Sequence, residues 1–292
     1  MNSVSNQSLD LSIIIVNYNG AAFIATCLDA IFNHKSKYSY EVIIVDNYSQ
    51  DESLAILDKY KSKIKLIVNE VNLGFGKANN QGLKIAQGKF IFYLNSDAFL
   101  LENTIDKLID FFKNTKDAGL VAPQLLNQDG TTQFNGSIFS KFIFNTEKPK
   151  AIGFVAAAAI LSSKKLLDKI GGFDENFFFY NEDIDLCKSI LKLGHKIYYV
   201  PEIKVIHVGG ASTKSIREDA VVEGFRGGLY LCKKHYGNVI YQIYRGFLGF
   251  YLLVSIVILS LMGFVMNKYL ILRNAYCRIL VLLIKDKVTR DI

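Results

Sequence analysis

Short apolar runs rich in β-branched residues alternate with helical patterns through the first hundred residues of the chain. Strands are expected at residues 11–17, 41–45, 64–68 and 90–94. Helices are expected at residues 21–32, 51–60 and 74–86. A chain that alternates in this way forms right-handed βαβ crossovers. The sequence therefore predicts an α/β fold with a mainly parallel, Rossmann-like sheet flanked by helices.

Beyond residue 100 the pattern continues less regularly. Further helices are expected at residues 102–113, 163–170 and 182–193, and further strands at residues 119–121, 197–200 and 205–208. Residues 135–150 have weak periodicity and are expected to form a loop. The expected organisation is a flexible N-terminus at residues 1–10, an α/β body at residues 11–240, and a hydrophobic, basic helical tail at residues 241–292.

The tail combines an apolar stretch with positive charge. Residues 246–267 contain no charged residue, which meets the length of about 20 residues for a membrane span. Residues 233–292 hold nine Lys or Arg against two Asp or Glu, which accounts for the whole net charge of +7. A neutral body with a basic, apolar tail favours an anionic membrane surface as partner over nucleic acid. Basic residues flank both sides of the apolar stretch, so their distribution does not select one membrane topology. The tail could be peripheral, re-entrant or a single span, or it could form a helical hairpin packed on the body.

The four cysteines are scattered without a metal-type spacing. The first residues lack the basic segment and apolar core of a secretory signal. Reduced thiols in a cytoplasmic setting are therefore expected.

Polar residues follow the expected strands at their carboxyl ends, where parallel sheets bind ligands. Asn17, Asp46 and Asp97 occupy such positions, and Asp97 belongs to the run Asn95-Ser96-Asp97. A second group, formed by Asn72, Gly74 and Asn79, lies at the start of an expected helix, where backbone amides can approach a phosphate. Taken singly, the Asp46 and Asp97 groups are better explained as a plain helix cap and a common strand end, and the Gly74 group is equally compatible with a Gly-rich turn.

Three acidic residues crowd the start of a later expected helix, directly after the aromatic run at residues 177–180. They are Glu182, Asp183 and Asp185. The helix dipole stabilises each by only about 0.3–1 kcal/mol, and their mutual repulsion opposes this. A carboxylate base or a cation site is therefore the favoured interpretation. His207 lies near the end of an expected strand, before Gly209-Gly210. Considered alone, such a histidine is more often a core residue than a ligand.

Together these motifs resemble a known family. The ordered set VNYNG, VDNYSQD, NLGFGKANN, LNSD, GGFDENFFFYNEDIDLC and VIHVGG is similar to that of the family 2 glycosyltransferases with the GT-A fold, and within them to the rhamnosyltransferase branch. The resemblance covers about residues 11 to 232, so the body at residues 11–240 is identified as a GT-A catalytic domain.

The resemblance implies a role for each motif. Asn17 and Asp46 are expected to contact the nucleoside of a nucleotide-sugar donor, while Asn72, Gly74 and Asn79 line its pocket. Asp97 matches the last acid of the family's DxD motif and implies a divalent cation, Mg²⁺ or Mn²⁺. Asn95 stands in place of the first acid of that motif, so the motif supplies one carboxylate to the expected cation and does not imply a strict metal requirement. His207 matches a position that often completes the metal site.

Asp183 matches the family's general base, and Glu182 and Asp185 are expected to orient the acceptor or the base. A carboxylate can take the proton of an acceptor hydroxyl as it attacks the anomeric carbon. The implied activity is an inverting, metal-dependent transfer of a sugar to a lipid-linked or polysaccharide acceptor. The implied setting is cell-surface glycan synthesis at the cytoplasmic face of the inner membrane.

The donor that the branch implies is dTDP-rhamnose, with a UDP-sugar of the GlcNAc, galactose or glucose type as the alternative. A nucleotidyltransferase is a second alternative, but VNYNGAAF lacks the Gly-rich, basic signature expected after its first strand. A third is a catalytically inactive glycan-binding protein, against which Asp97, Asp183 and His207 argue. The oligomeric state does not follow from the sequence.

Overall fold

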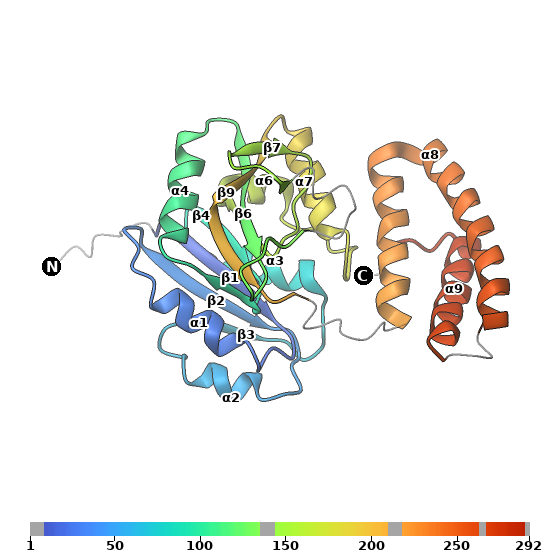
Figure 1. Ribbon diagram of the computed structural model, residues 1–292, viewed down its shortest axis with the longest axis horizontal. Helices are drawn as coiled ribbons and strands as arrows, with labels where there is room; N and C mark the ends of the chain where they lie inside the picture. The colour runs from blue at the N-terminus through green and yellow to red at the C-terminus, as the bar shows by residue number, and fades with distance from the viewer. Residues whose placement is uncertain (1–8, 135–143, 210–217, 263–266, 290–292) are drawn as a thin grey trace. The chain divides into compact units, whose positions relative to one another are not determined.

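The computed structural model describes residues 9–134, 144–209, 218–262 and 267–289. Their contacts divide the chain into two compact units, and Figure 1 labels the elements of both. The first unit comprises Met1–Phe173 and Leu186–Ser212, and the second comprises Asp174–Asp185 and Thr213–Ile292. Most of the expected flexible N-terminus, and residues 135–143 of the expected loop, lie outside the described residues.

Parallel strands form the N-terminal half of the sheet in the first unit. The strands are β1 (Leu11–Asn17), β2 (Tyr40–Asp46), β3 (Lys65–Val68) and β4 (Phe90–Leu94), and they pair in the order β3-β2-β1-β4. The helices between them are α1 (Ile24–Phe32), α2 (Ser53–Asp58) and α3 (Phe75–Ile85). These elements lie where the sequence pattern predicted them. The register places Asn17 opposite Asp46, so the polar ends of β1 and β2 are neighbours.

Antiparallel pairs complete the sheet. Its further strands are β5 (Ala98–Leu100), β6 (Ala118–Leu126), β7 (Lys150–Ile152), β8 (Ala159–Ser163) and β9 (Lys196–His207). The remaining helices that pack on the sheet are α4 (Thr104–Asn114), α6 (Lys164–Ile170) and α7 (Glu182–Lys192). β8 pairs antiparallel with both β4 and β6, whereas β6 runs parallel to β9. The predicted α/β class with flanking helices is confirmed, with a sheet of mixed direction.

One continuous strand, β9, replaces the two short strands expected at residues 197–200 and 205–208. Val200 and Lys204 pair with the consecutive residues Pro123 and Gln124 of β6, so residues 201–203 form an irregular insertion within the strand. Pro201, which lacks a backbone donor, lies in that insertion. β5 and β7 were not expected, because three residues are too short to show a strand period.

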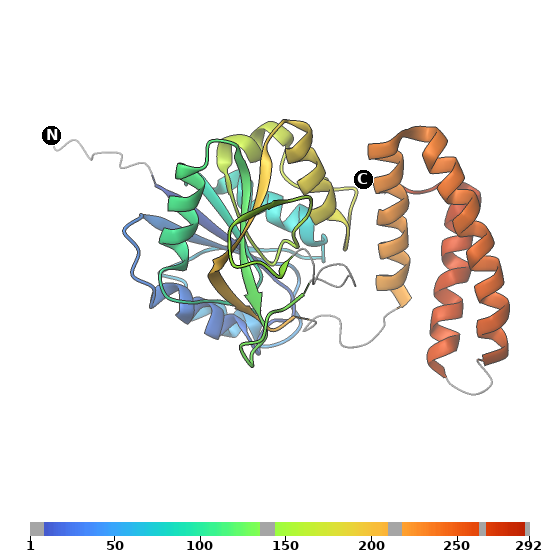
Figure 2. The same ribbon diagram turned by 45° about the horizontal axis from the view of Figure 1, so that its top comes forward.

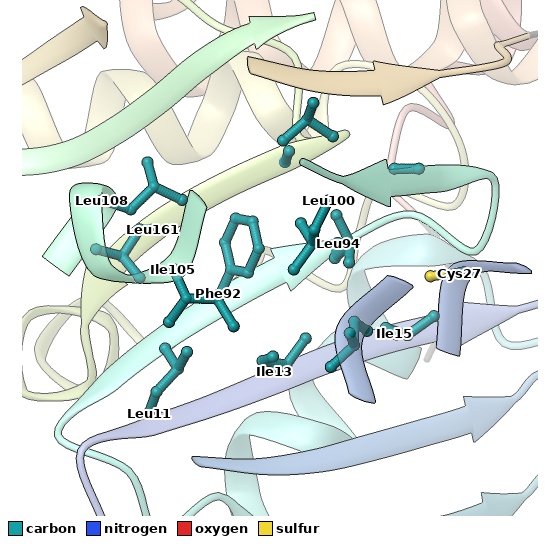
Figure 3. Packing of buried hydrophobic residues seen from close by; sticks show 14 of the residues in the cluster. Leu11, Ile13, Ile15, Cys27, Phe92, Leu94, Leu100, Ile105, Leu108 and Leu161 are labelled. Carbon is teal, nitrogen blue, oxygen red and sulfur yellow. The ribbon is translucent and has the colours of Figure 1, made fainter. Parts of the chain in front are cut away.

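Two hydrophobic layers cover the sheet, as expected for strands buried on both faces. Ile13 and Ile15 of β1 pack with α1 and α4, and Figure 3 shows this layer. Ile14, between them, packs on the opposite face with side chains of α3, α6 and α7. Figures 1 and 2 show these helices along the sheet. The buried strands hold the polar residues at their carboxyl ends in fixed positions.

The second unit consists mainly of α8 (Glu218–Met262) and α9 (Asn267–Lys285). Gly237, at a φ of 81°, breaks α8 into two helical segments. The expected boundary at residue 241 therefore falls inside α8, close to this break. Apolar side chains of the two helices form a core of their own, which includes Leu229, Tyr241, Leu252 and Ile279. Among the described residues, one helix, at Glu218–Leu261, is long and apolar enough to cross a membrane by length and composition alone.

Candidate active site

Asp97 and His207 lie side by side where β5 pairs with β9. Asp97 directly precedes β5, His207 ends β9, and the antiparallel register places Ala98 opposite His207. Two backbone groups fix Asp97: Val208 N donates to Asp97 O at 3.0 Å, and Gly209 N donates to Asp97 Oδ2 at 3.2 Å. His207 Nε2 then lies 3.3 Å from Asp97 Oδ1. Strand pairing thus brings together the two residues predicted to hold a cation.

Gln133 fixes the orientation of the His207 ring. Gln133 Nε2 donates to the His207 carbonyl at 3.1 Å and to Asn127 Oδ1 at 3.2 Å, which leaves Gln133 Oε1 as the acceptor 2.7 Å from His207 Nδ1. In the neutral ring Nδ1 therefore carries the hydrogen, and Nε2 presents a lone pair toward Asp97. Asn95 Nδ2 lies 3.2 Å from the same Nε2. A ring whose tautomer is set by a second residue is typical of metal-binding histidines.

A divalent cation fits this pair of acceptors. Asp97 Oδ1 and the His207 Nε2 lone pair face each other, and a positive ion between them would bond to both, in place of the Asn95 amide that reaches Nε2. Among the described residues no group of three His, Cys, Asp or Glu side chains is arranged to hold a metal ion by itself. The protein would therefore supply two ligands, and substrate phosphates and water the others, as is common for Mg²⁺. Both side chains keep some exposure, 12% for Asp97 and 14% for His207, so a ligand can reach them.

Asn17 and Asp46 form a buried network at the ends of β1 and β2. Asn17 Nδ2 donates to Asp46 Oδ2 at 2.9 Å and to Ser49 Oγ at 3.2 Å, and Ser49 Oγ donates to Asp46 Oδ2 at 2.7 Å. Asn19 N also donates to Ser49 Oγ, so the network connects the loops that follow the two strands. Asn17 and Asp46 are both fully buried. This geometry gives them a part in shaping the loops, and their direct contact with a nucleoside stays a prediction.

Asn72 and Gly74 shape the turn that enters α3. Asn72 Oδ1 accepts from Asn47 Nδ2 and from Gly74 N, both at 2.9 Å. Gly74 has a φ of 87°, a conformation that glycine adopts without strain. Asn79 is buried, and its Nδ2 donates to Phe75 O within its own helix at 3.0 Å. The pocket role of these three residues stays a prediction, and the contacts of Asn79 favour a structural part for it.

The three acidic residues at the start of α7 have different environments. Glu182 is 7% exposed, and burial together with the charge of Asp183 raises the pKa of Glu182 to about 8. Asp185 is 2% exposed and lies 2.8 Å from Lys234 Nζ and 2.7 Å from His235 Nε2. Asp183 is half-buried, and its Oδ1 accepts from Ile184 N at 2.8 Å. Asp183 is therefore the most accessible of the three carboxylates.

The predicted site residues divide between the two units. Those of the first unit are Asn17, Asp46, Asn72, Gly74, Asn79, Asp97 and His207, and those of the second are Glu182, Asp183 and Asp185. The sequence motifs do not point to Gln133 or Lys234, since neither lies at a strand end or in a recognisable pattern. Asn47 donates to Asn72 in the turn that enters α3. Its position next to Asp46 is a sequence signal that could have added it to the predicted site residues.

Comparison with known proteins gives a family match and named relatives. Residues 12–171 match the model described as "Glycosyl transferase family 2". A dolichyl N-acetyl-alpha-D-glucosaminyl phosphate 3-beta-D-2,3-diacetamido-2,3-dideoxy-beta-D-glucuronosyltransferase of Methanococcus voltae is 25% identical over 87% of this chain and 83% of its own. An N-acetylglucosaminyl-diphospho-decaprenol L-rhamnosyltransferase of Mycobacterium tuberculosis is 24% identical over 70% of this chain and 77% of its own. A poly(ribitol-phosphate) beta-glucosyltransferase of Bacillus spizizenii is 35% identical over 37% of this chain, which spans 18% of that relative's length.

Solved structures share the fold. A mannosyltransferase from Pyrobaculum calidifontis, in complex with GDP-Man and Mn²⁺, superimposes with a TM-score of 0.60 at 17% identity, over 77% of this chain and 63% of that one. At this identity the likeness concerns the fold, which is the GT-A type. The family match covers more than half of the chain and includes Asn17, Asp46 and Asp97. The chain therefore belongs to glycosyltransferase family 2 and is a glycosyltransferase.

Proposed function

We propose that this glycosyltransferase moves a sugar from a nucleotide donor with inversion at the anomeric carbon, using Asp183 as the base and Asp97 with His207 as the ligands of a divalent cation. The observation that carries the proposal is the 3.3 Å approach of His207 Nε2 to Asp97 Oδ1, with the ring tautomer set by Gln133. When bound, Mg²⁺ or Mn²⁺ would supply positive charge to the departing diphosphate. The Mn²⁺ in the mannosyltransferase complex of the same fold supports this assignment.

Asp183 is the residue of the acidic group best suited to accept a proton. An ionised carboxylate within hydrogen-bond reach can take the acceptor hydroxyl's proton as that oxygen attacks the anomeric carbon. Glu182, with a pKa of about 8, holds its own proton at neutral pH, and Asp185 is engaged with Lys234 and His235. One carboxylate is enough for a single in-line displacement, which inverts the configuration. Glu182 and Asp185 then serve to orient the base or the acceptor.

The proposed donor is dTDP-rhamnose, and the proposed acceptor is a sugar carried on a polyprenyl phosphate or diphosphate in cell-surface glycan synthesis. Two relatives, each matched over at least 70% of both chains, support the acceptor, because their names include a dolichyl phosphate and a diphospho-decaprenol. One of them is a rhamnosyltransferase, which supports the donor. The name of the beta-glucosyltransferase relative instead favours glucose as the transferred sugar. UDP-glucose is therefore the alternative donor, which the same site could accept with a different sugar pocket.

The helical tail is proposed to dock on the cytoplasmic surface of the membrane. Large apolar side chains are exposed on α8 after Gly237, which is unusual for a protein surface in water. They include Val239, Phe247, Phe250, Leu253, Val257 and Leu261. The positive charge of residues 233–292 would add attraction to anionic lipid headgroups. A surface-bound tail would keep the enzyme close to a lipid-linked acceptor.

An ion-pair cluster favours docking at the surface over crossing the bilayer. Arg278, in the middle of α9, has its Nη1 2.9 Å from Glu218 Oε1 and 2.8 Å from Asp219 Oδ1 at the start of α8. The polar first segment of α8 therefore lies along α9. A crossing bundle would carry these charges into the hydrocarbon, where they are costly, whereas an in-plane bundle leaves them in water.

A thermal-shift panel tests the proposed donor and cation together. dTDP-rhamnose, UDP-N-acetylglucosamine, UDP-glucose and GDP-mannose would each be added with and without Mn²⁺ or Mg²⁺. A ligand at about 100 times its dissociation constant stabilises by about 2.7 kcal/mol, which such a panel resolves. The largest shift is expected from dTDP-rhamnose with metal. A larger shift with a UDP-sugar would replace the donor, and no shift with any of them would contradict the proposed site.

A further inference from the structure

Lys234 connects the two ends of the segment that carries the acidic group. Its Nζ lies 2.7 Å from Asp174 Oδ2 and 2.8 Å from Asp185 Oδ1. These carboxylates are the first and last residues of Asp174–Asp185, the segment that packs with α8 in the second unit. Glu182 and Asp183 lie between them in sequence. One ammonium group on α8 thus closes a short loop that contains the proposed base.

Other groups on α8 complete these contacts. His235 Nε2 lies 2.7 Å from Asp185 Oδ1, and the side chains of both residues are 3% exposed. Tyr230 donates its hydroxyl hydrogen to Asp174 Oδ2 at 2.9 Å. Lys234 itself is 32% exposed, whereas Asp185 is almost completely buried. Removing the ammonium would leave a buried carboxylate with less compensation, which is strongly unfavourable.

The segment also packs closely on the same helix. Asn181 Nδ2 donates to Gly224 O at 3.0 Å. A Cβ on Gly227 would lie 2.8 Å from Asn181 Nδ2 and 3.1 Å from the backbone O of Tyr180, so only glycine fits there without movement. Tyr180 and Asn181 both have a φ of 70°, a conformation that L-residues adopt only where their surroundings impose it. Gly224, Gly227 and Lys234 follow helical spacing, so they form one face of α8.

We propose that Lys234 is a positioning residue for the transfer reaction: by joining Asp174 to Asp185 it fixes the segment between them and so aims the Asp183 carboxylate at the acceptor hydroxyl. The inference rests on the proposed role of Asp183. An error of about 1 Å in the position of a reacting group can cost about a hundredfold in rate. Loss of the Lys234 contacts should therefore lower the rate of the chemical step while leaving the donor pocket of the first unit unchanged.

The test compares Lys234→Met with Lys234→Arg, and uses Lys233→Met as the matched control. Lys233 is the adjacent lysine, 42% exposed, and it pairs with Asp286 at 3.7 Å. Hydrogen–deuterium exchange reports the order of residues 174–185. Transfer to a polyprenyl-diphosphate-linked N-acetylglucosamine is followed as release of nucleoside diphosphate, with the strongest donor among dTDP-rhamnose, UDP-N-acetylglucosamine, UDP-glucose and GDP-mannose.

For Lys234→Met we expect faster exchange in residues 174–185, and a kcat at least about tenfold lower with the donor KM within about twofold. Lys234→Arg should restore most of both properties, because it keeps the positive charge, and Lys233→Met should resemble the wild type. Unchanged exchange in Lys234→Met, or faster exchange with an unchanged kcat, would overturn the inference. Full kcat in Asp183→Asn, measured in parallel, would contradict the proposed base without affecting the exchange result.

If Lys234→Met does not fold, Gly227→Ala tests the same point. Its added methyl would displace the segment at Asn181, whereas Gly224→Ala places a Cβ 3.6 Å from the Tyr180 ring, an ordinary contact. Gly227→Ala should therefore loosen residues 174–185 and lower kcat, and Gly224→Ala should do neither. Equal kcat values in the two alanine variants would count against the inference.

Discussion

His207 Nε2 faces Asp97 Oδ1 at 3.3 Å, although the two residues lie on different strands, because β5 pairs antiparallel with β9. Gln133, from the segment that follows β6, sets the ring tautomer by accepting from Nδ1. The proposed cation site is thus assembled by three separate parts of the chain. Its properties should depend on Gln133 as well as on the two direct ligands.

Gln133→Leu should weaken cation binding without unfolding the protein. The substitution removes the acceptor of the Nδ1 hydrogen, so the ring can rotate or change tautomer and Nε2 no longer faces Asp97 reliably. Loss of such a partner typically costs about 10- to 100-fold in metal affinity. Titration of Mn²⁺ against donor turnover would measure the shift. Gln124→Leu is the control, because the Gln124 amide donates to Thr132 Oγ1. Equal metal dependence in both variants would contradict the role of Gln133.

Asp183→Asn should abolish most of the transfer activity while leaving donor binding intact. The amide cannot accept the acceptor's proton, and general-base contributions are typically about 10² to 10⁴ in rate. Single-turnover rates and the thermal shift with donor and Mn²⁺ separate the two effects. A variant that transfers sugar at the wild-type rate would show that another group acts as the base.

Glu182 should make the free energy of unfolding depend on pH between 4.5 and about 8. Its folded pKa, about 8, is raised above the ordinary value of 4.5 mainly by burial and then by Asp183. Below pH 4.5 the carboxyl is protonated in both states, so it carries no penalty. Between pH 4.5 and 8 the unfolded state releases the proton and the folded state retains it, so stability falls as pH rises through this window.

Glu182→Gln removes that titration. The Tm of the variant minus the Tm of the wild type should therefore become more positive as the pH increases from 5 to 8. Thermal unfolding at several pH values measures the difference. Glu202→Gln, at an exposed position, is the control and should show a constant difference from the wild type. If the Tm difference between Glu182→Gln and the wild type were also independent of pH, Glu182 would titrate normally in the folded protein.

The sequence predicted the first unit better than the second, for a physical reason. Strands such as Leu11–Asn17, buried on both faces, have a pattern that is set by local residues alone. The bounds of β1 and β4 were predicted without error, and those of β2 and β3 to within one residue. Asp97 and His207 were identified through motif resemblance, but their approach depends on the three-residue strand β5, which is too short to show a period. Lys234 has no local signature at all, because its proposed role rests on contacts with Asp174 and Asp185, which are far away in the sequence.

Gly20→Ala should destabilise the folded protein through the network at the end of β1. A Cβ at residue 20 would lie 2.2 Å from Asn17 Oδ1, so Asn17 would have to move away from Asp46 and Ser49. Overpacking of a buried site costs about 1–3 kcal/mol. Chemical denaturation measures it, with Gly153→Ala as the control because nothing lies within 4 Å of its added methyl. Equal stability of the two variants would contradict the tight packing at Asn17.

Phe247 and Phe250 provide the sharpest test of membrane docking. They are 73% and 69% exposed in α8, so replacing them with glutamine should not disturb the core that includes Leu252 and Ile279. If these rings enter the lipid, each substitution removes about 1.5–3 kcal/mol of apolar burial, or at least about tenfold in the partition coefficient. Co-sedimentation with vesicles of phosphatidylglycerol and phosphatidylethanolamine measures this coefficient directly.

The matched control for these substitutions is Val68→Gln, which removes a 52% exposed apolar side chain from β3 in the first unit. It should leave vesicle binding unchanged, since surface docking involves the tail alone. Higher salt should weaken the binding of the wild type and of both Phe variants by a similar factor, because the basic residues of the tail are retained. If the double Phe variant bound vesicles as tightly as the wild type, the exposed face of α8 would not be the docking surface, and attraction by the positive charges alone would have to account for the binding.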